Sequence, residues 1–224
     1  MSSVPPIVRE IESGMRRQYS EANVNESLSF IVNLQKFVYG MFNRSAGEQE
    51  ILREAARFIY HAFGFKEVTV PLRSPVDGKF RYEVFLGMTK DVEQSYRALA
   101  YDRDVVFDDD TYPGTKLSKF TELMLAELEP YDEGEEKTYN RPMMLSEQRK
   151  SIETMLEGDY YAVYLMGPGD DIFGWLELSS TKDGKFPPMT IIRQLELFAS
   201  ILSVMLSHWR CVPKKAPLQG QRTK

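Results

Sequence analysis

Between residues 160 and 205 the chain reads YYAVYLMGPGDDIFGWLELSSTKDGKFPPMTIIRQLELFASILSVM, and two kinds of hydrophobic pattern follow one another in it. Residues 160–166 are apolar at nearly every position, which indicates a central strand covered on both faces. The turn at 167–171 leads into a second strand, residues 172–179. This part of the sequence therefore predicts a β-hairpin.

A long helix is expected after this hairpin. It begins near Pro187-Pro188 and ends at Pro213. Its apolar residues step by four and three. We expect a helical dimer interface formed by this helix and by a second apolar stripe on a helix at 26–43, and the residues expected from the long helix are Ile191, Leu195, Phe198, Leu202 and Met205. The alternative is that both helices cover the back of the sheet, which needs the same stripes.

Upstream of this segment the sequence predicts two helices and another hairpin. Apolar residues recur at helical spacing over 26–43 and again over 51–63, where Gly64 provides a stop. Period-two alternation over 68–72 and 80–86 then indicates two strands joined by a turn. Because Pro71 cannot donate to a ladder, we expect an edge or a bulge near it.

The middle of the chain carries weaker patterns. We expect a short helix at 92–99 and a helix at 117–128, where Leu117, Phe120, Leu123, Met124 and Leu128 form a stripe. A further helix is expected around 146–156. The acidic run Asp102 to Asp110 lacks the spacing of a calcium loop, so a solvated loop is favoured there.

The composition is that of a folded globular protein. Hydrophobic residues make up 42% of the 224 and charged residues 27%, unlike the balance in disordered chains. The net charge of −5 gives no basic surface for phosphates, so we expect no nucleic-acid partner. With a single cysteine, no signal peptide and no apolar run of membrane-spanning length, we expect a cytoplasmic location and no membrane contact.

The order of these elements resembles that of GAF domains. Residues 161–166, the glycine-rich turn, residues 173–178 and Phe186-Pro187-Pro188 before a Leu-rich helix are similar to the closing part of that family. The resemblance covers residues 46–209. It implies an α/β (α+β) fold, with a central antiparallel sheet as in GAF and PAS domains, helices on both sides, and N- and C-terminal helices packed together. The domains expected from it are a helical extension at 1–44, a sensor domain at 45–210 and a disordered basic tail at 211–224.

The best-known chemistries of that family find little support here. GAF domains that bind cyclic nucleotides have an Asn-Lys pair, a Phe and an Asp-Glu pair, whereas this chain keeps only Lys182 and Phe186. Bilin attachment and methionine sulfoxide reduction use pocket cysteines, but Cys211 lies beyond the expected domain. His61 and His208 are isolated and make no metal motif. We expect no cofactor, no metal and no catalytic site, and hence a protein that is not an enzyme.

In GAF domains the ligand sits between the sheet and the middle insertion. The resemblance therefore implies a pocket around Trp175 and Glu177, with Arg97 as an anion partner and three tyrosines: Tyr82, Tyr101 and Tyr112. Glu177 is expected on a central strand, on the same face as Phe173 and Trp175. A carboxylate there must be solvated, paired or used, so a salt bridge at the sheet margin and a ligand contact both remain open. The aromatic residues could equally be ordinary core.

Two functions follow from these patterns. The first is a regulatory GAF domain that binds a small molecule and signals through helices to a second copy of the chain or to a signalling protein. The second is a GAF fold used only as a dimerisation or protein-interaction scaffold. An open cavity with convergent polar groups would favour the first, and a pocket filled by side chains would favour the second.

Overall fold

The computed structural model describes residues 24–43, 46–128 and 135–211. The chain divides into two compact units, Met1–Ser45 and Ala46–Lys224, and each is described by itself. The first unit contributes one described helix, α2 (Val24–Asn43), so the packing of that helix against the terminal helix stays a prediction. The arm before residue 24 and the basic tail after residue 211 lie outside the described residues.

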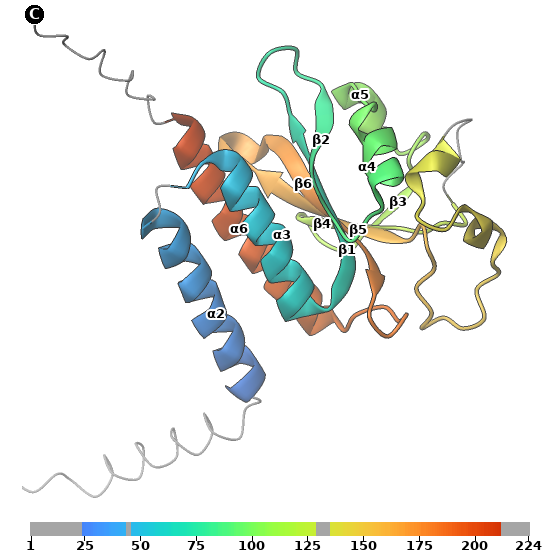
Figure 1. Ribbon diagram of the computed structural model, residues 1–224, viewed down its shortest axis with the longest axis horizontal. Coiled ribbons are helices and arrows are strands. Elements are labelled where there is room, and N and C mark those ends of the chain that lie inside the picture. The colour runs from blue at the N-terminus through green and yellow to red at the C-terminus, as the bar shows by residue number, and fades with distance from the viewer. Residues whose placement is uncertain (1–23, 44–45, 129–134, 212–224) are drawn as a thin grey trace, which may run out of the picture. The chain divides into compact units, whose positions relative to one another are not determined.

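The second unit is built on a six-stranded antiparallel sheet with the order β2-β1-β6-β5-β4-β3 (Figure 1). The two predicted hairpins, which supply the four strands at one end of the sheet, are confirmed. The strands are β1 (Phe65–Arg73), β2 (Phe80–Leu86), β3 (Gly114–Lys116), β4 (Thr121–Met124), β5 (Tyr160–Met166) and β6 (Ile172–Thr181). Strand β5 lies between β4 and β6, as its unbroken apolar run predicts.

Two long helices cover one face of this sheet, and shorter helices lie over the other (Figure 1). The covering pair is α3 (Glu48–Phe63) and α6 (Met189–Cys211), which meet where the rings of Phe58 and Phe198 stack with centroids 4.7 Å apart. Over the opposite face lie α4 (Lys90–Arg97) and α5 (Arg103–Val106). The 3₁₀ turns η1 (Glu135–Thr138), η2 (Pro142–Ser146) and η3 (Pro168–Asp170) complete the described elements. The mixed α/β architecture, with helices on both sides of an antiparallel sheet, confirms the predicted fold class.

Helix α6 uses its apolar stripe inside the domain. Leu195, Phe198 and Leu202 are fully buried and Met205 nearly so. The hydroxyl of Ser203, on the same helix, donates to the carbonyl of Ala199. The stripe that we expected to form a dimer interface is therefore explained by the alternative, coverage of the sheet. Only Ile191 of that set is partly exposed.

By length and composition alone, the stretch Met189–Arg210 of α6 could cross a membrane, with a mean hydropathy of 1.5. We expected no apolar run of membrane-spanning length from the sequence, so α6 is more apolar than expected. Burial of its stripe in the domain core accounts for that composition, because core helices and membrane helices share it.

Two of the expected helices are wrong. Residues 117–128 form β4 and its turns, because pairing of β4 with β5 outweighs a weak helical stripe whose end residues, Leu117 and Leu128, stay exposed. Residues 147–156 form no helix, and Ile152 is exposed. There the guanidinium of Arg149 pairs with Asp159 at 2.8 Å, and that buried carboxylate also accepts from the backbone of the same loop. A buried ion pair of this kind fixes a loop that local propensity does not encode.

Two irregularities in the strands decide which side chains face which side of the sheet. The ladder between β1 and β2 shifts register between Val70 and Pro71, which confirms the bulge expected at the proline. The ladder between β5 and β6 shifts at Met166, which pairs with Ile172, so that Phe173 is the extra residue. Beyond the shifts, the faces alternate regularly.

Candidate functional site

A cavity of about 110 Å³ lies on the face of the sheet that the two long helices do not cover. Its floor is formed by alternate residues of neighbouring strands, such as Tyr160, Ala162 and Tyr164 of β5. Its walls come from α4, from the segment after it, and from residues 138–140. The cavity is therefore enclosed by the sheet on one side and by the middle of the chain on the other, and it is partly open to solvent.

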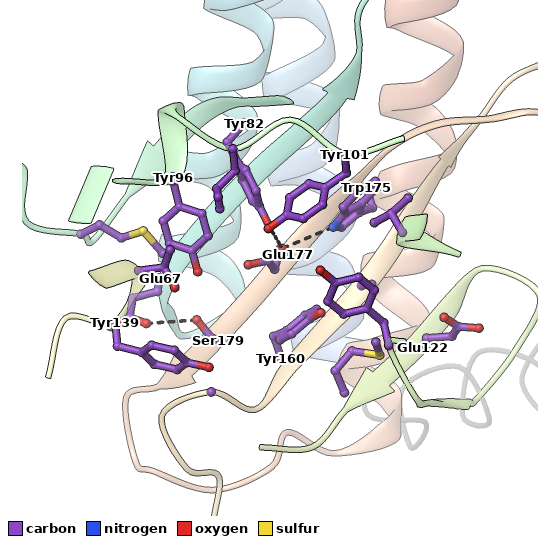
Figure 2. Close-up of a pocket in the computed structure, with 18 of the residues that line it drawn as sticks. Glu67, Tyr82, Tyr96, Tyr101, Glu122, Tyr139, Tyr160, Trp175, Glu177 and Ser179 are labelled. Atoms are coloured by element: carbon purple, nitrogen blue, oxygen red, sulfur yellow. Dashed lines mark hydrogen bonds between the residues drawn. The ribbon is translucent and has the colours of Figure 1, made fainter. Parts of the chain in front are cut away.

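Glu177 of β6 lies at the centre of this cavity (Figure 2). It is 7% exposed, and both of its hydrogen bonds end on the same oxygen. Tyr82 donates its hydroxyl to Oε2 at 3.0 Å, and the indole Nε1 of Trp175 donates to the same atom at 3.4 Å. Among the described residues no lysine, arginine or histidine pairs with this carboxylate within 4.0 Å, so burial and not an ion pair dominates its environment.

Burial raises the pKa of Glu177 to about 7, although the hydrogen bonds from Tyr82 and Trp175 oppose the rise. Thr69 lies opposite Glu177 in the ladder between β1 and β6, and its buried hydroxyl has no hydrogen-bond partner in the described part of the chain. Burial likewise raises the pKa of Tyr82, so its hydroxyl keeps its proton and remains a donor. Near neutral pH the carboxyl is therefore poised between its neutral and charged forms.

A second carboxylate, Glu67 of β1, reaches the same cavity. It accepts from Asn140 Nδ2 at 2.9 Å and from the hydroxyls of Ser179 and Ser180 at 3.0 Å each. Because Glu67 pairs with Ser179 across the ladder, it is a diagonal neighbour of Glu177, close enough for the two long side chains to reach the same space. Glu67 also lacks a basic partner within 4.0 Å among the described residues.

Two more glutamates line the cavity but have partners with a positive charge. Glu157 forms an ion pair with Arg141 at 2.9 Å, and Glu122 lies 3.7 Å from Lys116 while it accepts a short hydrogen bond from Tyr164. No lysine, arginine or histidine is found among the described residues that line the cavity. The site is thus acidic, and its charge is least compensated at Glu67 and Glu177.

Aromatic rings form most of the remaining wall. Figure 2 shows rings around Glu177 on several sides, with Tyr82 and Tyr101 on one side and Tyr160 on another. Tyr82 packs against Tyr96 with centroids 4.6 Å apart and against Tyr101 at 6.4 Å. Rings that contact one another in this way hold a wall in place without filling the space in front of it.

The structure brings together five of the six residues expected at the pocket: Tyr82, Tyr101, Tyr112, Trp175 and Glu177 all line the cavity. Arg97 does not line it. Its guanidinium binds Glu93 at 2.7 Å and lies over the ring of Phe85, beside a separate groove against α3. Phe173 also leaves the expected face, because the register shift turns it toward Arg210 of α6.

Several lining residues were not among the six expected at the pocket, including Glu67, Tyr96, Glu122, Tyr139, Asn140, Tyr160 and Ser179. Alternation along 160–164 could have placed Tyr160 and Tyr164 on the face of Trp175, since their strands are neighbours. Glu67 and Asn140 carried no such signal, because only the register of β1 on β6 and the path of the loop bring them there.

The residues that match the family's cyclic-nucleotide motif lie elsewhere. Lys182 donates to the carbonyl of Tyr60 at the end of α3, and the ring of Phe186 packs on Tyr161, whose side chain is buried away from the cavity. The acidic run is not the plain solvated loop that was favoured there, because Arg103–Val106 within it form α5 and Asp102 before that helix binds Lys79 at 2.9 Å. In the described part of the chain no group of three or more histidine, cysteine or acidic residues could hold a metal ion.

Comparison with solved structures shows which known fold this architecture matches. The chain is similar to the GAF domain of a phosphoenolpyruvate-protein phosphotransferase from Acinetobacter, at 11% identity and a TM-score of 0.52 over 83% of this chain and 97% of that one. A GAF domain/HD domain protein from Geobacter sulfurreducens gives 10% identity and a TM-score of 0.54, over 75% and 98%. The GAF domain of a phosphotransferase from Coxiella burnetii gives 14% and 0.53, over 82% and 95%.

The chain therefore has the GAF-domain fold, as the resemblance in its sequence predicted. No family model and no curated protein matches the sequence. At identities this low the similarity defines the fold, and the function has to be argued from the site.

Proposed function

We propose that this protein is a regulatory sensor domain that binds a small molecule in the cavity over its sheet. The observation that carries the proposal is the cavity itself, an unfilled space of about 110 Å³ into which buried carboxylates, tyrosine hydroxyls and an indole converge. A domain that served only as a scaffold would gain stability by filling that space with side chains, because empty volume in a core lowers stability.

The cavity also lies where binding can be transmitted. Its floor strands β5 and β6 have α6 packed on their opposite face, where the backbone N–H of Met166 donates to Ser203 of α6 at 3.1 Å. A ligand that favours one arrangement of the floor therefore biases the position of α6, which is the form that coupling between distant sites takes. We infer an output through helices, to a second copy of the chain or to a signalling partner. In this proposal the domain performs no catalysis and works in the cytoplasm.

The test is a thermal-shift screen of the full chain against cationic, neutral and anionic metabolites. We expect at least one class to raise the melting temperature, because a ligand that binds only the folded state stabilises it. The matched variant is Ala162→Phe, which places a ring on the cavity floor. It should remove the shift while the variant still unfolds cooperatively.

A scaffold without a ligand is the competing function. It is favoured if the whole panel leaves both proteins unshifted at millimolar concentrations, and the sensor proposal is then wrong. A shift that persists in Ala162→Phe would place the binding site outside this cavity and would equally contradict the proposal.

A further inference from the structure

The residues that line the cavity are not those of an anion-binding site. A phosphate or carboxylate ligand needs lysine, arginine, histidine or several backbone N–H groups directed at it. The described lining supplies none of the three basic residue types, and Arg97, the one expected anion partner, is bound to Glu93 outside the cavity. An anion would also enter beside Glu67 and Glu177, which have no basic partner among the described residues, and their charged forms would repel it.

The same lining has both parts of a site for an organic cation. The first part is uncompensated negative charge, at Glu177 and at Glu67, which are diagonal neighbours on the floor. The second part is a wall of aromatic rings near the buried carboxylate, among them Tyr82, Tyr96 and Trp175 (Figure 2). Aromatic faces attract ammonium groups through their quadrupole, most strongly where water is excluded.

We infer that the ligand of this cavity is an organic ammonium ion, whose charged nitrogen lies between Glu177 and the aromatic wall. This inference rests on the proposed function and adds the class of the ligand. Tyr82 and Trp175 hold the carboxylate through Oε2, and the ammonium group supplies the positive partner that the described residues do not. Asn140, Ser179 and Ser180 hold Glu67 in the same way, so that both acids keep their orientation while the site is empty.

Binding of an ammonium ion should also depend on pH, through the charge state of Glu177. The groups around it are Tyr82 from β2, Tyr96 from α4, Tyr101 from the loop after α4, Tyr160 from β5, Thr69 and the diagonal neighbour Glu67 from β1, and Trp175 on its own strand. Burial holds the pKa values of Tyr82 and Tyr96 well above neutral, so these two hydroxyls keep their protons, whereas burial raises the pKa of Glu177 to about 7. An ammonium ion binds its charged form, and the affinity should therefore rise about tenfold from pH 6 to pH 8.

The experiment is isothermal titration of the full chain with choline, whose charge does not change with pH, and with its neutral isostere 3,3-dimethylbutan-1-ol. Butanoate is the anionic titrant of similar size. We expect choline to bind roughly tenfold more tightly than the alcohol or the acid, because only choline has the charge that the cage recognises. Trp175→Leu should weaken choline binding and leave the weak binding of the alcohol unchanged.

The decisive variant is Glu177→Gln, which keeps an acceptor for Tyr82 and removes the charge. It should lower the affinity for choline about tenfold or more and make the remaining affinity independent of pH. The matched control is Glu50→Gln on the exposed first turn of α3, which removes one charge outside the cavity and should change neither value. Far-UV circular dichroism of both variants checks that they fold.

The outcomes separate this inference from the proposed function. If the alcohol or butanoate binds as tightly as choline, or Glu177→Gln leaves choline binding intact, the ammonium inference is wrong. The sensor proposal survives that result as long as some metabolite binds the chain and Ala162→Phe abolishes its binding. If neither choline nor any member of the metabolite panel binds, both proposals fall.

Discussion

At the scale of single residues, Glu177 makes the stability of the domain depend on pH. A carboxyl whose pKa is about 7 in the folded chain and 4.5 in the unfolded chain binds its proton more tightly when folded. Its contribution to stability is therefore complete below pH 4.5 and is lost as the pH rises through 7. Without ligand, the free energy of unfolding of the native protein should fall by on the order of 3 kcal/mol, relative to that of Glu177→Gln, as the pH rises from below the unfolded pKa to above the folded one.

Urea unfolding of both proteins at pH 5, 6, 7 and 8 measures this difference. The other titrating groups are common to the two chains, so they cancel when the free energies of unfolding are subtracted. Glu50→Gln is again the control and should keep the slope of the native protein. Parallel pH profiles for the native protein and Glu177→Gln would show that the buried carboxyl is not the group that titrates.

At the scale of elements, the close contact of β1 with β6 depends on Gly174. This glycine pairs with Leu72 and lets the two strands approach closely. A Cβ atom there would lie 2.5 Å from Leu72 Cδ2 and 2.6 Å from the carbonyl oxygen of Pro71. Gly174→Ala should therefore lower the free energy of unfolding by about 2 kcal/mol, because the backbone of β1 has to move.

Chemical denaturation measures that change, and Gly167→Ala is the matched control. A Cβ at Gly167 would meet its nearest neighbours at 3.6 Å, which is ordinary packing distance, and its φ of −89° suits any residue. Its effect should stay within about 0.5 kcal/mol. Equal effects of the two alanines would contradict the account of Gly174.

At the scale of the whole molecule, we propose that the chain forms a homodimer through α2. The dimer expected along the apolar stripe of α6 has lost its support, since that stripe is core. Helix α2, in contrast, exposes apolar side chains at spacings of three, four and seven residues, namely Leu28, Ile31, Val32, Tyr39 and Phe42. Such spacing is typical of helices that pair along a seam.

Sedimentation velocity tests this proposal on the full chain. At tens of micromolar the native protein should sediment as a dimer, and Ile31→Asp, which places a charge in the exposed stripe, should shift it to a monomer. Ser29→Asp, on an exposed residue outside the stripe, is the control and should leave the dimer intact. A native protein that stays monomeric at this concentration would contradict the proposal.

The sequence by itself determined the elements whose pattern is strong and local. Period-two alternation over 68–72 and 80–86, the apolar run at 160–166 and the segment 172–179 after its turn identified four strands. Helical stripes identified α3, which ends at Gly64, and α6, which begins near Pro188. With these elements in order, the fold class and the resemblance to GAF domains followed. Five of the six pocket residues also followed, but only from that resemblance, which places the ligand between the sheet and the middle insertion.

The tertiary structure decided what depends on pairing and on long-range contacts. Strands β3 and β4 form because β5 offers a ladder, and the loop at 147–156 is held by the ion pair of Arg149 with Asp159. The register of β1 on β6 brings Glu67 beside Glu177, and Arg97 pairs outside the cavity with Glu93. These choices reverse the expected charge of the site, from one that would hold an anion to one suited to a cation, because electrostatics depends on distances that no local pattern encodes.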